Sequence, residues 1–573
     1  MMTRSPSGRA IGALLVAVLA VSAVSTASPI GAQQTAPRPG QTPGPRFLVG
    51  TLVSDGSKLG FQVANAVRDR IASDFDMRTL WVVPESVITK GLKDSGYPVD
   101  QPLSRSETRQ LTQAFRADET LLGTVFRTPS GGYRVEADWS LTRRDDMVQP
   151  LPPVEAAKIS DVARLLAREF SAARQQVEAV QRCNDLARAR NIPGALAAAR
   201  KAIDAYPRSV LGRICIANIY AQEKLGPDSL IRVSQEILAI HPRNVRALSF
   251  AADAYEAQGA TDDLLRTLRI LAQVDSTSRD VPRRLVRALA SAGRFAEAVP
   301  TIDSIVTREP TDIEAVALQW RVHLNARDWA GTLRIGEALV ALDTAAATRE
   351  FFVRMIAAAD AAGDAVKAAE LSGRGVAKYP ADDELAMLNV QFLRRTGNAR
   401  GALDAVRVVV RRSPRTPNAW LQKARLEADL GASPDTVLAT FRRAQENGED
   451  RAAISRQTVL VGQAAAKDST AANRLDPART AIRYFKFAES MHATDTTALF
   501  LGSASLTLGQ LAANEARTTR QCDQVKESES ALVDAQISLP KAGSTFRDQV
   551  SRLIPALTAT VTYAEQLKKA LCR

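Results

Sequence analysis

The sequence predicts a mainly α protein in which a small α+β domain precedes an α-solenoid of helix pairs. A triplet of Gly, Ala and Pro recurs after 34 residues with unchanged internal spacing, as Gly363, Ala368 and Pro380 and then Gly397, Ala402 and Pro414. Such a period is typical of stacked helix–turn–helix units. Apolar residues make up 45% of the chain but aromatic residues only 5%, which favours helices packed through small side chains. Residues 133–142 alternate between apolar and polar side chains, which indicates a half-buried strand of the smaller domain.

The first 45 residues are expected to lie outside both domains. Arg4 and Arg9 precede an apolar run over residues 11–21, and small residues follow at 25–27 and 30–32. This pattern indicates a secretory signal peptide over residues 1–32. Residues 33–45 are rich in Pro, Gly and Gln, so we expect a disordered linker. The run is about half of the ~20 residues that a membrane helix needs, and we expect no transmembrane span in the mature chain.

Residues 46–153 are expected to form the α+β domain. Strands are predicted at 47–53, 80–83, 121–126 and 133–142, with a helix over 59–71 and another after the capping box of Ser104 and Glu107. A long helical stretch then starts near Glu155, and we assign residues 154–176 to a connecting helix. The predicted element order is β-α-β-α-β-β-α.

This domain resembles the amino-terminal domain of TolB-type proteins and the related CsgG- and FlgO-like envelope domains. The resemblance rests on the opening strand RFLVGTLVS, the helix after it, the LLGTV run from Leu121 and the hairpin GGYRVEADWSL. It implies a domain of the bacterial cell envelope. No β-propeller pattern follows, so the chain departs from TolB itself.

Residues 177–495 are expected to form the helical repeats and residues 496–573 a C-terminal helical cap. The turn position of the repeats reads Gly259, Gly293, Arg327, Gly363, Gly397 and Gly431. The pattern resembles the tetratricopeptide repeat (TPR) family most clearly from about residue 208 to 448. Two residues depart from it: the large aromatic residue expected early in the first helix appears only as Trp420, and Trp320 stands where a small residue is usual. The cap is predicted to hold three further helices.

The four cysteines are Cys183, Cys215, Cys522 and Cys572. An even, small number in an exported chain favours disulfides, and four cysteines allow three pairings. We favour Cys183–Cys215 and Cys522–Cys572, because each pair lies within one local helical unit. No C-x-x-C motif occurs, so neither a thioredoxin-like site nor a zinc finger is supported.

No set of residues with the pattern of a catalytic or cofactor site was found. His241, His323 and His492 lie far apart in different repeats and lack metal-ligand spacing, so we interpret them as ordinary surface or turn residues. The segment from Gly50 to Lys58 joins a strand to a helix but fails the phosphate-loop template. We therefore predict no enzyme activity, no cofactor and no metal.

The TPR resemblance implies that the fifth, ninth, twelfth and thirteenth positions of each first helix line a concave groove. In this chain those positions include Arg283, Arg287, Arg321, Asn325, Gln391, Arg394, Arg395 and Arg425, with Asp360 and Asp429 as opposing charges. Arginine binds carboxylates through two parallel hydrogen bonds. The groove is therefore a candidate site for an acidic protein or peptide partner; the alternative is a solvated helix face in an Arg-rich chain.

Together these observations predict an exported, non-catalytic scaffold of the periplasm or cell envelope in a bacterial-type cell. Its solenoid groove would bind a protein or peptide, and its α+β domain would be a second docking module. A regulatory or assembly subunit of an envelope complex is the alternative, and an envelope enzyme is the third class. The net charge of +13 favours an anionic surface, and hence peripheral association with the envelope, whereas export argues against nucleic acid.

Overall fold

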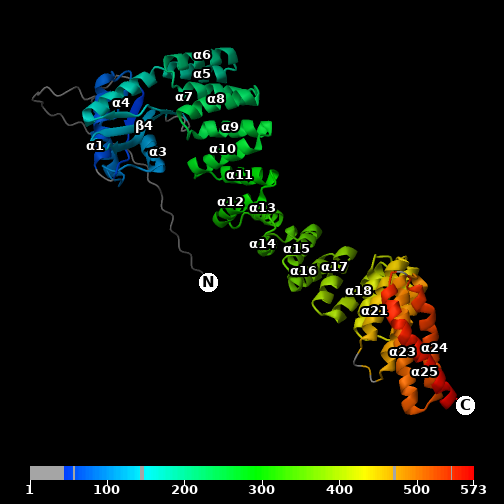
Figure 1. Cartoon of the computed structure of the whole chain (residues 1–573). Coiled ribbons are helices and arrows are strands. Elements are labelled where there is room, and N and C mark those ends of the chain that lie inside the picture. Colours follow the sequence, from blue (N-terminus) through cyan, green and yellow to red (C-terminus); the bar gives the residue numbers. More distant parts are fainter. Residues whose placement is uncertain are drawn as a thin grey trace, which may run out of the picture. The chain divides into compact units, whose positions relative to one another are not determined.

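The computed structural model describes residues 44–55, 58–141, 147–468, 471, 473–543 and 545–572. The predicted signal peptide and nearly all of the predicted linker therefore lie outside the described residues. The chain forms two compact units that divide between Ala288 and Leu289, and each is described by itself. The fold is mainly α, as predicted, with an α+β domain ahead of stacked helix pairs (Figure 1).

The α+β domain contains one mixed sheet with the strand order β2-β1-β3-β4-β5, and β6 also pairs with β4. The first strand pairs in parallel with β2 and β3, whereas β3, β4, β5 and β6 pair antiparallel. The elements are β1 Arg46–Val49, α1 Leu59–Asp74, β2 Trp81–Val82, α2 Glu85–Asp94, α3 Arg105–Ala114, β3 Glu119–Arg127, β4 Tyr133–Leu141, β5 Val148–Pro150, β6 Val154–Ala156 and α4 Ile159–Arg174. Helix α2 and strands β5 and β6 were not predicted.

Side chains of β1 alternate between two cores, as a strand buried on both faces requires. Phe47 points to α1 and α4 and stacks on Phe170 with ring centroids 4.5 Å apart. Leu48 points to the other face and packs with α2 and α3. The capping box predicted at Ser104 and Glu107 is confirmed at the start of α3.

Helix α4 is fixed to the sheet by a buried ion pair. Arg174 donates to both carboxylate oxygens of Glu119, at 2.7 and 3.1 Å, and the indole of Trp139 donates to the same carboxylate at 3.0 Å. Residues 154–156 form a strand of the sheet, and α4 packs in the core with α1. The structure thus differs from the expected connecting helix over 154–176, because this stretch completes the α+β domain.

A buried polar network joins the α+β domain to the first repeats within the same unit. Gln149 of β5 donates to the Arg208 carbonyl at 2.9 Å and accepts from the backbone N–H of Val210 at 2.8 Å. Gln176 donates to Gln149 and accepts from the Ser209 hydroxyl. Side chains of the first repeats, among them Leu211, also enter the core of the domain.

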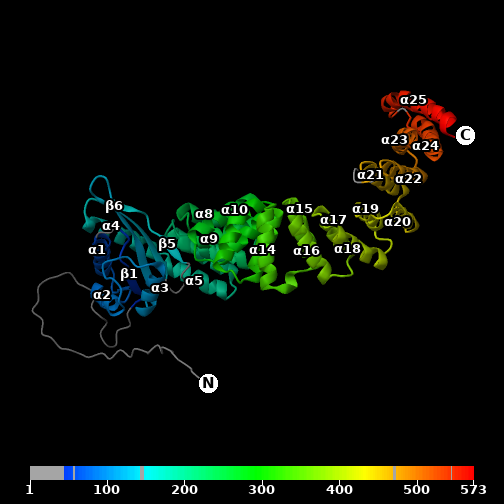
Figure 2. The same cartoon turned by 90° about the horizontal axis from the view of Figure 1, so that it is seen from below.

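Helix pairs follow one another from α5 onward. In the first unit the pairs α5–α6, α7–α8 and α9–α10 are stacked (Figure 1). In the second unit, pairs such as α15–α16 and α17–α18 lie side by side (Figure 2). The helices are α5 Val177–Arg188, α6 Ile192–Ala205, α7 Val210–Gln222, α8 Pro227–Ile240, α9 Val245–Gln258, α10 Thr261–Val274, α11 Asp280–Ser291, α12 Phe295–Arg308, α13 Ile313–Asn325, α14 Trp329–Leu342, α15 Arg349–Ala361, α16 Ala365–Lys378, α17 Asp383–Arg395, α18 Ala399–Arg412, α19 Ala419–Asp429, α20 Pro434–Glu446, α21 Arg451–Ala466 and α22 Leu475–Met491.

The turn inside each pair from α5–α6 to α19–α20 uses a residue at positive φ. The predicted turn glycines all have positive φ, between +71° and +81°. Arg327 stands at the same register position and has φ +59°. Arg190 and Lys224 have φ +56° and +50° and continue the register toward the N-terminus. The turn therefore demands this conformation even where no glycine is present.

Small residues set how closely the helices approach. Ala368 and Ala402 are fully buried in the cores of their repeats, as predicted. Trp320, the large residue at a position where a small one is usual, is accommodated by Gly336 of α14. A Cβ at Gly336 would lie 2.5 Å from the Met355 sulfur and 3.1 Å from the Trp320 indole nitrogen.

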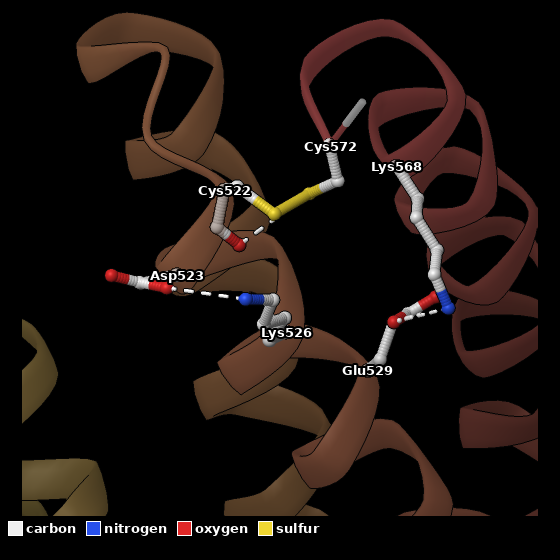
Figure 3. Close-up of a disulfide and its surroundings, with 6 residues drawn as sticks. All are labelled: Cys522, Asp523, Lys526, Glu529, Lys568 and Cys572. Carbon is white, nitrogen blue, oxygen red and sulfur yellow. Dashed lines mark hydrogen bonds and ion pairs between the residues drawn. A yellow bond between two sulfur atoms is a disulfide. The ribbon is translucent and has the colours of Figure 1, made fainter.

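The C-terminal segment contains the three predicted helices, α23 Asp495–Thr519, α24 Cys522–Lys541 and α25 Arg547–Leu571. The first and last each have 25 residues, but only Leu557, Thr560 and Ala564 of α25 are buried, compared with twelve residues of α23. Both predicted disulfides are present. Cys183–Cys215 is buried, whereas Cys522–Cys572 is half-exposed and ties the end of α25 to the start of α24 beside the Glu529–Lys568 ion pair (Figure 3).

The first prediction concerns the turn conformation. Arg327→Gly should raise the free energy of unfolding by roughly 0.5–1 kcal/mol, because it removes the strain of a side chain at positive φ. Gly363→Ala should lower the free energy of unfolding by about 1 kcal/mol, because it places a side chain on a residue with positive φ. A steric clash does not contribute, since the added Cβ would meet no other atom within 4 Å. Denaturant titration of the full chain measures both. Changes of the same sign in the two variants would contradict the assignment.

The second prediction concerns α25. Because few of its residues are buried, the disulfide should supply much of its local stability; closing a loop of 50 residues contributes about 4 kcal/mol on the chain-entropy estimate. Cys522→Ser with Cys572→Ser should therefore speed amide exchange throughout α25. The matched pair Cys183→Ser with Cys215→Ser should leave α25 unchanged. Unaltered exchange in α25 of the first variant would show that packing alone holds the helix.

Candidate functional site

The eight predicted partner-binding residues lie on four first helices of the repeats. Arg283 and Arg287 lie on α11 in the first unit. The second unit holds the others: Arg321 and Asn325 on α13, Gln391, Arg394 and Arg395 on α17, and Arg425 on α19. The structure brings three of the eight together in one hollow, between α17 and α19.

This hollow, which we call the α17–α19 hollow, has a volume of about 580 Å³. Its polar lining consists of Glu384, Gln391, Arg394, Arg395, Asn418 and Gln422. Its apolar lining consists of Met387, Leu388 and Pro417. Charged guanidinium groups thus stand next to apolar side chains, a combination that suits a ligand with both an acidic and an apolar part.

Carboxylates of neighbouring repeats hold the arginines in place. Arg395 of α17 forms an ion pair with Asp360 of α15. Arg394 donates to the Gln422 side-chain oxygen at 3.1 Å, and its Nε lies 4.0 Å from Asp429. Arg425 donates to the same Asp429 at 3.0 Å. Three arginines therefore share two carboxylates, which fixes the guanidinium groups, and the carboxylate of Glu384, which lines the hollow, forms an ion pair with Arg349.

The remaining predicted residues are used differently. Asn325 donates its side-chain N–H to the Arg321 carbonyl at 2.7 Å, so its amide is engaged within its own helix. The Arg321 and Arg287 side chains are exposed, and Arg283 is half-buried. None of these four residues lines the α17–α19 hollow.

Six lining residues were missed by the sequence analysis: Glu384, Met387, Leu388, Pro417, Asn418 and Gln422. The 34-residue register does relate two pairs of them, because Glu384 and Leu388 of α17 correspond to Asn418 and Gln422. The residue type at position 418 is a sequence signal for this site, because Asn418 adopts φ +63° in the structure. Asparagine enters the left-handed region more readily than most residues.

A second hollow of about 570 Å³ lies on the other side of the α18–α19 connection. Asp383, Asn447 and the run from Ser413 to Pro417 line it. Pro417 lines both hollows, so the segment ahead of α19 separates them. Its Thr416 hydroxyl is bonded to the Asp383 carboxylate at 3.2 Å.

Glu449, from the next repeat, reaches the start of α19. Burial raises the pKa of the Glu449 carboxyl above its ordinary value, although the interaction of this carboxylate with the backbone N–H of Asn418 acts in the opposite direction. The Oε1 atom is buried and finds no hydrogen-bond partner among the described residues. Charge at this position is therefore unfavourable for the folded state.

The histidines differ from expectation at one position. His323 is buried, whereas a surface or turn position was predicted. Its two ring nitrogens lie 2.7 Å from Asp328 and 2.9 Å from Asp303, so it links α12, α13 and the start of α14. Within the described ranges no group of three or more His, Cys, Asp or Glu residues is arranged to hold a metal ion.

No protein-family model matches the chain, and neither does any curated protein. Solved structures that align with it include YrrB, a TPR protein with an unusual peptide-binding site, with 16% identity and a TM-score of 0.27 over 33% of this chain and 95% of YrrB. Naa15/Naa10 bound to HypK-THB aligns with 14% identity and a TM-score of 0.37 over 69% of this chain and 64% of that one. A tetratricopeptide repeat protein from Parabacteroides merdae aligns with 12% identity and a TM-score of 0.20 over 50% of this chain and 99% of its own.

At these identities the likeness concerns the fold alone. The predicted resemblance of the α+β domain to TolB-type and CsgG-like domains stays a prediction. Across the described part of the chain, each helix is too short or too polar to cross a membrane.

The third prediction follows from Glu449. A carboxyl group whose pKa is raised by folding destabilises the folded state once the pH exceeds its ordinary pKa, 4.5 here. Glu449→Gln keeps an oxygen that can accept the Asn418 N–H and removes the charge. We expect a higher Tm than that of the wild type at pH 7, with the difference vanishing as the pH falls below 4.5. An unchanged difference across this range would contradict the assignment.

Proposed function

We propose that this chain is an exported, non-catalytic scaffold that binds an acidic peptide segment of a protein partner in the α17–α19 hollow. The observation that carries the proposal is the placement of Gln391, Arg394 and Arg395 beside Met387, Leu388 and Pro417 in a hollow of about 580 Å³. This volume lies within the range of roughly 300–1,000 Å³ that is usual for ligand sites.

The chemistry of the lining defines the peptide. A carboxylate of the peptide would compete with Asp360 and Asp429 for the guanidinium groups of Arg394 and Arg395. An apolar side chain next to that carboxylate would contact Met387 and Leu388. The polar side chains of Gln391, Asn418 and Gln422 offer donors and acceptors to the peptide backbone. Because the arginines are exposed in part, binding should weaken with salt.

A second docking surface on the α+β domain is part of the proposal. The segment after β1 and the end of β3 carry two exposed apolar side chains, Val53 (48% exposed) and Phe126 (46% exposed). Val53 bridges to Thr124, two residues before Phe126, so the three side chains share one face of the sheet. An apolar pair of this kind suits contact with another protein of the envelope.

The fourth prediction tests the hollow. A random-heptapeptide library displayed on phage is panned against the full chain, and the affinities of enriched peptides are measured by fluorescence anisotropy. We expect an acidic residue beside an apolar one in these peptides. Arg394→Gln with Arg395→Gln should weaken them at least tenfold, because each charge-assisted contact is worth about 1.5–3 kcal/mol.

Arg287→Gln with Arg321→Gln is the matched control, since it removes the same charge from exposed positions outside the hollow. We expect it to bind within twofold of the wild type. If the control variant loses peptide binding and the variant with Arg394→Gln and Arg395→Gln retains it, the binding site lies outside the α17–α19 hollow. A wild-type chain that enriches no peptide would overturn the proposed function.

The fifth prediction tests export. Cleavage at the predicted sites gives a mature chain that begins between Ser28 and Gln33. N-terminal sequencing of protein from the cell-envelope fraction measures it. An intact Met1 in a cytosolic fraction would contradict export without bearing on peptide binding.

A further inference from the structure

The first turn of α19 is unwound, whereas the first turns of α13, α15 and α17, the first helices of the three preceding pairs, are helical. Helices α13, α15 and α17 each have 13 residues, whereas α19 has 11. In the 34-residue register, Thr416 corresponds to Asp382, the residue that caps α17, and Pro417 to the first residue of α17. Helix α19 begins only at Ala419, so the shortening falls at its start.

The sequence of this segment is otherwise suited to start a helix. Threonine is a favoured N-cap residue and proline a favoured first residue. Asn418 interrupts the helix, because its φ of +63° is incompatible with a right-handed turn. Its side chain forms no cap hydrogen bond, whereas Asp382 accepts from the Leu385 N–H at 2.9 Å.

Contacts from three directions hold the unwound turn. Thr416 bonds to Asp383 of the preceding repeat. The indole of Trp420 donates to the Pro414 carbonyl at 2.8 Å. The Glu449 carboxylate of the following repeat interacts with the Asn418 N–H. The turn is therefore a defined conformation.

Both hollows flank this turn, and Pro417 contributes to each. Of the residues that belong to the turn, Asn418 also lines the α17–α19 hollow. In α17 the corresponding residues, Asp383 and Glu384, lie in the first helical turn. A regular first turn at α19 would move Pro417 and Asn418, which now line the α17–α19 hollow.

We infer that Asn418, by keeping the first turn of α19 unwound, shapes the α17–α19 hollow and so determines its affinity for the peptide. The inference rests on the proposed function and names a residue that shapes its binding site. Asn418 acts through the backbone, which separates its role from that of the arginines. Pro417 supplies the apolar wall that the peptide contacts.

Two uncharged substitutions test the inference on the full chain. Both substitutions remove the amide that lines the hollow, so the comparison between them isolates the backbone conformation. Asn418→Gly tolerates positive φ and should keep the turn unwound. Asn418→Ala disfavours positive φ and should rewind the turn, so it should bind the enriched heptapeptides at least tenfold more weakly than Asn418→Gly. Amide exchange at residues 420 and 421, whose N–H groups would bond to the carbonyls of residues 416 and 417 in a regular turn, reports rewinding as slower exchange in the alanine variant alone.

The outcomes separate this inference from the proposed function. Slower exchange in Asn418→Ala together with the same affinity as Asn418→Gly would show that the unwound turn does not make the site, while the arginine variants still decide the function. Unchanged exchange in Asn418→Ala would show that Asn418 does not hold the turn open, which also overturns the inference. If the wild type enriches no peptide, the proposed function fails and the inference fails with it.

Discussion

The left-handed residue between the two helices of a pair is the constraint on which the repeat array depends. One residue at positive φ lets the chain reverse direction in a short turn, so the second helix of a pair starts beside the end of the first. Only then do the small residues of one helix, such as Ala402, face the neighbouring helix. The conformation persists at Arg190, Lys224 and Arg327, where the side chain opposes it. Packing of the flanking helices therefore outweighs the local backbone preference there.

Repeat arrays need closed ends, because each unit buries its apolar face against the next. In the first unit the α+β domain supplies this cover: inside the contact Gln176 donates to Gln149, Gln149 donates to the Arg208 carbonyl, and Gln176 accepts from the Ser209 hydroxyl. At the other end of the sequence α25 packs against α23 and α24, and Cys572 fixes its last turn. Different chemistry thus serves the same purpose: a buried amide network in one unit and a covalent bond in the other.

Much of this architecture was predictable because it is local or periodic. The 34-residue register identified the turn residues and the buried alanines, and proximity in sequence identified both disulfides. Contacts between repeats were harder to predict. The register placed Arg395 on the groove face but did not show that Asp360, 35 residues earlier, pairs with it. Trp320 departs from the repeat pattern in the sequence, because Gly336, which makes room for its side chain, lies on another helix. Asn418 follows an ordinary helix-start sequence, so its backbone conformation needed the three-dimensional contacts of Glu449 and Trp420 to be recognised.

The shared core of the α+β domain and the first repeats has a consequence for how such a chain can be rearranged. Modules joined by a linker can be exchanged, since each keeps its own interior. Here a cut anywhere between β6 and α7 would expose Leu211 on one side and strand β5 with Gln149 on the other. Recombination that swaps the amino-terminal domain would therefore have to carry at least the helices through α7 with it. The segment that would have to be exchanged as one piece is therefore longer than the α+β domain that the sequence patterns predict.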